Sequence, residues 1–500
     1  MVIAISFLTA IWLWFSPAAA AAPRIGLNPD TGPPTSKVTV KGKGFFPNAE
    51  VDIFFDTVNQ ALVTTTPRGD FSVTIEAPAA AQPGEHWITA KERLGRIGPR
   101  AAQKPFLVRT DWAQWGFGSE RQGWNPYENT LNSSNVANLE LAWRDQIRGE
   151  PFESLATPVV AGGVVYSYNS YGILTAFKAK TGQRLWDSPL GTNWTLGISP
   201  AVAGSLVYVG ADDYYYALNA ASGNIQWKAE YHRGDIDSSP AVADGVVYAS
   251  VSYADLLYAF KGTDGSIIWT RNIDNPKNSG WCNGPPAVAG GVVYVASCSD
   301  HLYAFKTAKG RRQWLTKIFH GGRPSVATAN GMVYVGSEGA WGCAFSAFNA
   351  DSGILAWSAL VSGNAGPPAV ANGTVYVGSG DGNLYAFNAD SGALLWTSPT
   401  GGSIFSPPSV ANGVVYIGSS DGKIYAFRAD NGTLLWRAAL SKPGHPIYCS
   451  PIVADGMVFV SDCVSLSAFS LFGRQDHPEV PRPDPGTLMP DRSLTLRPGQ

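Results

Sequence analysis

A unit of about 40 residues recurs along most of this 500-residue chain, and this repeat constrains the fold more than any other feature. Each unit holds four short runs in which apolar and polar residues alternate, separated by turn sequences such as A-N-G and A-D-S-G. A period of two predicts four β-strands per unit, here called A to D. Strand B carries a Val-Tyr or Val-Phe pair, and strand D carries a tryptophan four residues after a turn glycine. The strand-D tryptophans are Trp186, Trp227, Trp269, Trp314, Trp357, Trp396 and Trp436.

Four antiparallel strands per unit predict the blade of a β-propeller and argue against a helical solenoid. Each A strand opens with a proline, which lacks an N–H group and therefore suits the innermost strand of a blade. These prolines are Pro158, Pro200, Pro240, Pro286, Pro324, Pro368, Pro408 and Pro451.

The last unit lacks its D strand, because Gly473 is not followed by a tryptophan four residues later. Upstream of the first unit, however, residues 139–143 form an isolated D-strand pattern that ends in Trp143. We expect this segment to complete the last blade, which would leave few free strand edges. The sequence therefore predicts an all-β fold with a closed eight-bladed propeller over residues 139–473.

The repeat and the lead-in sequence at residues 110–138, with Asp111–Gly116 and Asn135–Leu139, resemble the pyrroloquinoline-quinone (PQQ)-like propeller repeat of the quinoprotein-like superfamily. The resemblance implies that Trp143 and the seven strand-D tryptophans dock between neighbouring blades. The family contains quinoprotein dehydrogenases, the outer-membrane assembly lipoprotein BamB and non-catalytic binding propellers. Its fold alone therefore does not define a function.

Different patterns flank the repeats. Residues 23–109 contain alternating strands with glycine, proline and asparagine turns, and G-x-G-F-x-P-N at residues 42–48 resembles bacterial immunoglobulin-like domains of the IPT/TIG kind. The resemblance implies a small Ig-like β-sandwich that acts as a spacer, with an adhesion module as the alternative. Residues 474–500 are rich in proline, so we expect this tail to be disordered or extended.

The N-terminus predicts export. Val2–Phe15 form an apolar run that is shorter than the about 20 residues a membrane span needs, and alanines with A-x-A spacing follow. We interpret residues 1–22 as a signal peptide and expect a secreted, periplasmic or cell-surface monomer with no transmembrane span after cleavage. A formal net charge of −2 argues against nucleic acid as a partner.

Four of the five cysteines flank A–B hairpins in two equivalent units, and an exported protein can form disulfide bonds. We predict the pairs Cys282–Cys298 and Cys449–Cys463. Cys343 is left over, and we interpret it as a packed thiol.

The D–A and B–C loops differ most between the units, and both kinds of loop lie on one face of a propeller. We call this the loop face and place the candidate ligand site there. The candidate residues are Glu153, Trp194, Tyr214, Asp235, Asp237, Trp281, Asn283, His320, Arg323, Trp341, His445 and Tyr448. The alternative is that they are solvated loop residues without a common ligand.

The sequence contains no catalytic motif and no set of metal-ligand spacings. It also lacks the Cys-Cys pair and the C-x-x-C-H segment that resemblance to quinoprotein alcohol dehydrogenases would imply, and Asp235 with Asp237 is weak support for calcium. We therefore favour a non-catalytic scaffold that binds a protein or small molecule, with no cofactor. A PQQ-dependent dehydrogenase of alcohols or sugars with Ca²⁺ at the central mouth is the alternative, and a BamB-like envelope assembly factor is a second.

Overall fold

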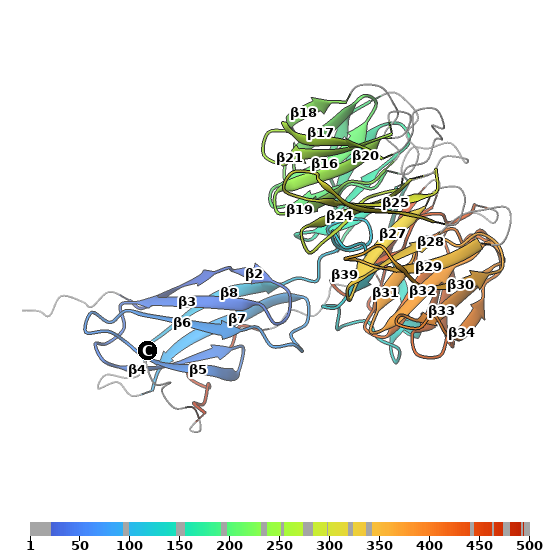
Figure 1. The fold of residues 1–500 in the computed structure, drawn as a ribbon. Helices are drawn as coiled ribbons and strands as arrows, with labels where there is room; N and C mark the ends of the chain where they lie inside the picture. The colour runs from blue at the N-terminus through green and yellow to red at the C-terminus, as the bar shows by residue number, and fades with distance from the viewer. Residues whose placement is uncertain are drawn as a thin grey trace, which may run out of the picture. The chain divides into compact units, whose positions relative to one another are not determined.

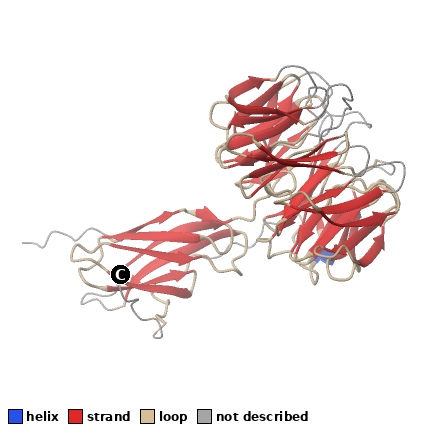
Figure 2. Ribbon diagram, viewed as in Figure 1, coloured by secondary structure: helices blue, strands red, loops and turns tan. Residues whose placement is uncertain are grey.

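The computed structural model describes residues 22–93, 100–146, 156–191, 198–231, 238–251, 255–273, 284–297, 299–318, 324–336, 343–440, 445–462, 465–473, 481–491 and 494, without the side chains of Gln146, Cys343 and Ala344. These residues form β-strands joined by turns (Figures 1 and 2), and the one helix among them is the 3₁₀ turn η1 (Val136–Asn138). The all-β fold class is thus confirmed. The expected signal peptide lies almost entirely outside the described residues.

The chain divides into two compact units. The first contains Met1–Ala79, Gly84–Val108 and Glu479–Gln500, and the second contains Ala80–Pro83 and Arg109–Pro478. The chain thus returns to the first unit after it has completed the second. Residues 481–491 are the main described part of the proline-rich tail.

The first unit contains two sheets. One has the order β1 (Arg24–Asn28), β3 (Lys37–Lys43), β6 (Phe71–Glu76); the other has the order β2 (Thr31–Gly32), β8 (Ala101–Val108), β7 (Gly84–Glu92), β4 (Glu50–Phe55), β5 (Val58–Thr64). Strand β6 alternates strictly between buried and exposed residues, as expected for a strand with one face toward a core. Phe55 lies 5.1 Å from His86 and 6.0 Å from Phe106 between ring centroids, and all three side chains are buried in this core.

In the second unit, each repeat forms one antiparallel sheet of four strands, and we number the sheets in chain order. Sheet 7 has a fifth strand, β9 (Trp124–Asn125), which pairs parallel with its first strand, β35 (Ser409–Ala411). Sheets 1 to 4 are β11 (Val159–Ala161), β12 (Val164–Tyr168), β13 (Ile173–Lys178), β14 (Arg184–Pro189); β15 (Ala201–Ala203), β16 (Leu206–Ala211), β17 (Tyr214–Asn219), β18 (Ile225–Glu230); β19 (Ala241–Ala243), β20 (Val246–Val251), β21 (Leu256–Lys261), β22 (Ile267–Asn272); and β23 (Ala287–Ala289), β24 (Val292–Ser297), β25 (His301–Lys306), β26 (Arg312–Lys317).

Sheets 5 to 8 follow the same order, except that sheet 8 takes its fourth strand from elsewhere in the chain. They are β27 (Ser325–Ala329), β28 (Met332–Gly336), β29 (Cys343–Asn349), β30 (Leu355–Val361); β31 (Ala369–Ala371), β32 (Thr374–Gly378), β33 (Asn383–Asn388), β34 (Leu394–Pro399); β35 (Ser409–Ala411), β36 (Val414–Gly418), β37 (Lys423–Arg428), β38 (Leu434–Ala439); and β39 (Ile452–Ala454), β40 (Met457–Ser461), β41 (Ser465–Ser470), β10 (Glu140–Gln146).

Strand β10 precedes sheet 1 in the chain but pairs antiparallel with β41, the last strand of the repeats. The amide of Ser450, next to β39, also donates to Thr157 Oγ1, next to β11, over 3.0 Å. Sheets 8 and 1 are therefore joined by segments that lie far apart in the sequence.

The strand-D tryptophans bridge successive sheets. Trp186 Nε1 donates to the carbonyl of Ala220 in the next sheet over 3.1 Å, and the Tyr166 hydroxyl donates to the same carbonyl over 3.2 Å. Trp143, Trp227, Trp269, Trp314, Trp357 and Trp396 make the equivalent bond, with N···O distances of 2.7 to 3.2 Å. A β-bulge in strand D lies just before the tryptophan in sheets 1 to 7, which gives each indole the same direction.

In sheet 5 the alignment of the repeat units by their opening prolines is wrong, because Pro324 does not occupy the position of the other seven prolines. Ala327 pairs with Tyr334, whereas in the other sheets the residue directly after the proline pairs with the strand-B aromatic residue. The turn at Asn330 and Gly331, both with positive φ, sets the register of this hairpin, so Pro324 lies upstream of the position that the repeat assigns to it.

Candidate functional site

Residues 109–131, most of which belong to the predicted lead-in sequence at 110–138, are from here on called the lead-in segment. They contact the innermost strand of every sheet in turn. The residue reached is always the penultimate one of the strand, and six of these residues donate their amide N–H to a main-chain carbonyl of the segment. The contacts are Trp112 with Val160, Ala113 with Val202, Gln114 with Val242, Ser119 with Val288, Glu120 with Thr328, Gln122 with Val370, Gly123 with Val410 and Asn125 with Val453. One continuous stretch of chain thereby supplies hydrogen-bond partners for main-chain groups of the inner strands that would otherwise be unpaired at the sheet edges.

Arg121 projects from the lead-in segment and is 2% exposed. Its guanidinium donates to the carbonyls of Pro240 (2.6 Å), Ser239 (3.0 Å) and Pro286 (3.1 Å), and also to that of Trp115, whose ring lies 5.1 Å below it. Burial lowers the pKa of Arg121 to about 9, so the side chain is still a cation at neutral pH. Three of its four acceptors, Ser239, Pro240 and Pro286, are main-chain carbonyls that directly precede two of the inner strands, β19 and β23.

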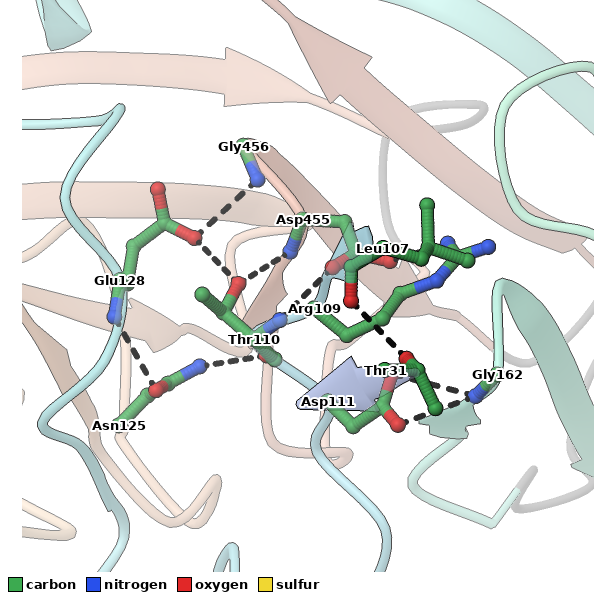
Figure 3. Close-up of polar contacts among 10 residues, drawn as sticks. All are labelled: Thr31, Leu107, Arg109, Thr110, Asp111, Asn125, Glu128, Gly162, Asp455 and Gly456. Atoms are coloured by element: carbon green, nitrogen blue, oxygen red, sulfur yellow. Dashed lines mark hydrogen bonds and ion pairs between the residues drawn. The ribbon is translucent and has the colours of Figure 1, made fainter. Parts of the chain in front are cut away.

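The beginning of the lead-in segment is fixed where sheets 8 and 1 meet (Figure 3). Arg109 Nη1 and the amide of Thr110 donate to the two carboxylate oxygens of Asp455, in the A–B turn of sheet 8, over 2.9 and 2.8 Å. The carboxylate of Asp111 accepts the amide of Gly162, in the A–B turn of sheet 1, at 3.1 and 3.2 Å. Burial, and then the nearby charge of Asp455, raise the pKa of Asp111 to about 6.

Glu128 is the second fixed point of this segment. One carboxylate oxygen accepts Thr110 Oγ1 (3.0 Å) and the amide of Gly456 (3.1 Å), and the other accepts two amides that follow it in the chain. Burial raises the pKa of this side chain although these donors oppose the shift. Figure 3 shows Glu128, Thr110 and Asn125 in one continuous network of hydrogen bonds, which holds this part of the chain in place.

The described part of the loop face contains an exposed aromatic pair. Phe405, in the D–A loop that leads to sheet 7, is 36% exposed, and Tyr448, in the next D–A loop, is 44% exposed. Their ring centroids are 6.0 Å apart. Phe405 and Tyr448 each lie three residues before the proline that precedes an innermost strand, β35 in sheet 7 and β39 in sheet 8.

Hydrogen bonds hold both loops that carry this pair. The amide of Ile404 donates to Ser379 O (2.9 Å), and the amide of Ile447 donates to Ser419 O (3.1 Å). Ser406 Oγ donates to Cys449 O over 2.9 Å and so joins the two loops. Rings on fixed backbone lose little conformational entropy on binding, which is typical of interface anchors.

Three of the twelve predicted loop-face residues are described. Tyr448 belongs to the aromatic pair, and His445 lies in the same loop with its carbonyl beside Gly422. Tyr214 is half-buried, and its ring contacts Tyr216 and Lys228 of its own sheet. The remaining predictions lie outside the described residues: Glu153, Trp194, Asp235, Asp237, Trp281, Asn283, His320, Arg323 and Trp341.

The sequence analysis missed Phe405 and Arg121. Phe405 lies three residues before Pro408, as Tyr448 lies three residues before Pro451, so the repeat alignment contains the signal for the pair. No comparable signal exists for Arg121, because the lead-in segment does not repeat and therefore has no equivalent position with which to align it.

The predicted disulfide bonds stay predictions. Cys449 is buried, while Cys282, Cys298 and Cys463 lie outside the described residues, as does the side chain of Cys343. Within the part of the chain that the structure describes, His, Cys, Asp and Glu side chains form no group of three that could hold a metal ion. No helix in that same part is long and apolar enough to cross a membrane.

A family model described as outer membrane protein assembly factor BamB matches residues 128–345, 344–466 and 411–489. Among curated proteins, the BamB of Yersinia pestis is 33% identical over 171 residues, which is 32% of this chain and 43% of that protein. The tetrathionate hydrolase of Acidithiobacillus ferrooxidans is 26% identical over 236 residues, 43% of this chain and 47% of that protein. The chain thus spans less than half the length of these two relatives.

Solved structures show the same fold. A quinohemoprotein alcohol dehydrogenase from Pseudomonas putida aligns with a TM-score of 0.60 at 16% identity and covers 75% of this chain and 82% of its own. BamB from Moraxella catarrhalis aligns with a TM-score of 0.55 at 15% identity and covers 66% of this chain and 99% of its own. At these identities the likeness shows a PQQ-like propeller fold without assigning an activity.

Proposed function

Because this chain belongs to the family whose model is described as outer membrane protein assembly factor BamB, we propose that it is a non-catalytic scaffold that binds a protein partner at its loop face. The observation that carries the proposal is the exposed pair of Phe405 and Tyr448 on two loops joined by Ser406. Aromatic anchors of this kind dominate the binding energy of many protein interfaces.

The proposal includes the finer architecture. Sheets 1 to 8 form an eight-bladed propeller that β10 closes, and the first unit is an Ig-like spacer. Residues 1–22 act as a signal peptide, so the protein works outside the cytoplasm, in the periplasm or at the envelope surface. Relatives named as outer membrane protein assembly factors support an envelope location and a protein partner.

The second candidate, a PQQ-dependent dehydrogenase, is supported by relatives such as the quinoprotein alcohol dehydrogenase of Pseudomonas putida. PQQ carries three carboxylates, so a site for it needs cationic side chains with donors to spare. Arg121 is the buried cation among the described residues at the inner strands, and all three of its nitrogens already donate to main-chain carbonyls. The described residues therefore do not fit the cofactor.

The test compares three forms of the full chain immobilised on resin and exposed to detergent-solubilised envelope proteins. We expect the wild type to retain one discrete protein and the variant F405A/Y448A to lose it at least about tenfold. The control L394A/L395A changes exposed residues at the start of β34, on the opposite face, and should retain the partner. Equal retention by all three forms would refute the site, and turnover of an alcohol or sugar with added PQQ and Ca²⁺ would replace the scaffold with the dehydrogenase.

A further inference from the structure

The tail residues 481–491 lie on the outer face of the five-stranded sheet of the first unit. In β7 the buried side chains His86, Ile88 and Ala90 point to the core, so Trp87, Thr89 and Lys91 belong to the opposite, outer face. Strand β8 adds Gln103 to this outer face, directly across from Thr89. Thr89 is nevertheless fully buried. The outer face is therefore covered at its centre.

Side chains of this face bind the backbone of the tail. Gln103 Nε2 donates to Pro483 O (2.8 Å), Lys91 Nζ donates to Leu488 O (2.7 Å), and Arg93 Nη2 donates to Asp491 O (3.1 Å). The three acceptors are spaced along the segment, so the face contacts the main chain of the tail at three points.

Two side chains of the tail add specificity. Arg482 lies over the ring of Trp87, with 4.8 Å between its guanidinium carbon and the ring centroid, and its Nε donates to Gln103 Oε1 over 2.7 Å. Leu488 is 2% exposed, whereas the adjacent Met489 is 78% exposed. Hydrogen bonds of Gly486 and Thr487 to Asp484 form the turn that directs Leu488 inward.

We propose that this outer face is a peptide-binding surface for a proline-containing segment of the form R-P-D-P-G-T-L, with its turn at Asp484–Thr487, and that the chain's own tail occupies it as a tethered, exchangeable ligand. Two of the three donors, Lys91 and Gln103, lie on β7 and β8, whose main chains are hydrogen-bonded to each other along their length. These strands therefore do not depend on the tail for their backbone hydrogen bonds. Most tail residues other than Leu488 stay exposed or half-buried, which is typical of a docked peptide rather than of a core strand. A tether raises the local concentration of such a ligand to about the millimolar range, so even weak intrinsic affinity keeps the site filled.

The test starts from the complete folded protein. A site for a specific protease is inserted within residues 474–480, the protein is cleaved after folding, and the released tail is removed by dilution and filtration. A fluorescent peptide with the sequence of residues 481–491 is then titrated into the cleaved protein and into the uncleaved protein, with near-ultraviolet circular dichroism as the check on folding.

We expect saturable binding to the cleaved protein and at least about tenfold weaker binding to the uncleaved protein, whose surface is occupied. The peptide change Leu488→Asp should weaken binding at least about tenfold, while Met489→Asp should change it less than about twofold. Replacement of Gln103 by Ala in the protein should also weaken it. Absence of binding to the cleaved, folded protein, or equal effects of the two peptide changes, would overturn the proposal.

A second copy of the chain is the other source of the same segment. Dimers of the uncleaved protein that depend on concentration and disappear with Leu488→Asp would show that the tail binds in trans, which contradicts the tethered arrangement. A monomer that persists at all concentrations supports it.

Discussion

The indole of Trp227 lies against Gly265 of the next sheet, where a Cβ atom would approach the ring to 2.5 Å. The same indole donates to the carbonyl of Gly262, in the same turn, over 2.8 Å. The spacing between glycine and tryptophan in the repeat thus reflects two contacts: the glycine of each unit accommodates the tryptophan of the unit before it.

Replacement of Gly265 by Ala should therefore lower the unfolding free energy for two reasons, backbone strain and a steric clash. The residue has a φ of +72°, which alone costs an alanine about 1 kcal/mol, and the collision with Trp227 should raise the loss of unfolding free energy to about 2–4 kcal/mol. Gly245 has a φ of +75° with nothing within 4 Å of its Cβ position, so G245A measures the backbone penalty by itself. Denaturant titrations of both variants test this, and equal losses would rule out the proposed packing role.

Arg121 should be essential for stability. Replacement by Met leaves the carbonyls of Ser239, Pro240 and Pro286 without this donor, and we expect a loss of about 2–5 kcal/mol. The control R428M removes an exposed pair with Asp430 and should leave the denaturation midpoint unchanged, because water and salt screen such a pair. If R121M unfolds at the same denaturant concentration as the wild type, the lead-in segment does not hold the inner strands together as described.

Asp111 should make stability depend on pH between 5 and 7. Its pKa is about 6 in the folded protein and 3.8 without the fold, so the folded state binds the proton more tightly and stability decreases as the pH rises through this range. The wild type should gain about 1 kcal/mol relative to D111N when the pH falls from 7 to 5. Denaturant titrations of both proteins at the two pH values give this difference. A constant difference would mean that the carboxyl group is not buried beside Asp455.

The aromatic pair should contribute to binding and little to folding. Because Phe405 and Tyr448 are 36% and 44% exposed, F405A/Y448A should change the unfolding free energy by less than about 1 kcal/mol. Thermal unfolding checks this prediction and validates the variant for binding experiments. A large destabilisation would instead assign the two rings to the packing of the loops.

The repeat made the strands predictable because one pattern occurs many times, and errors in a single unit cancel. Strand β10 was predicted to complete the last sheet because Trp143 keeps the spacing of the array. The path of the lead-in segment was not predictable, since six of its eight contacts with inner strands use its main-chain carbonyls, and only those of Gln114 and Asn125 use a side chain. Phe405 was overlooked because a single aromatic residue in a loop does not indicate a site. The signal emerges only when the units are aligned, since Phe405 and Tyr448 each lie three residues before the proline of their unit.

The central claim, a partner-binding loop face, is tested most directly by photo-crosslinking in cells. A photoreactive phenylalanine analogue is placed at Phe405, at Tyr448 or at Leu394, which is 55% exposed on the opposite face. The account predicts that positions 405 and 448 cross-link to the same single envelope protein and that position 394 does not. Cross-links of equal yield from all three positions, or none from 405 and 448, would contradict it.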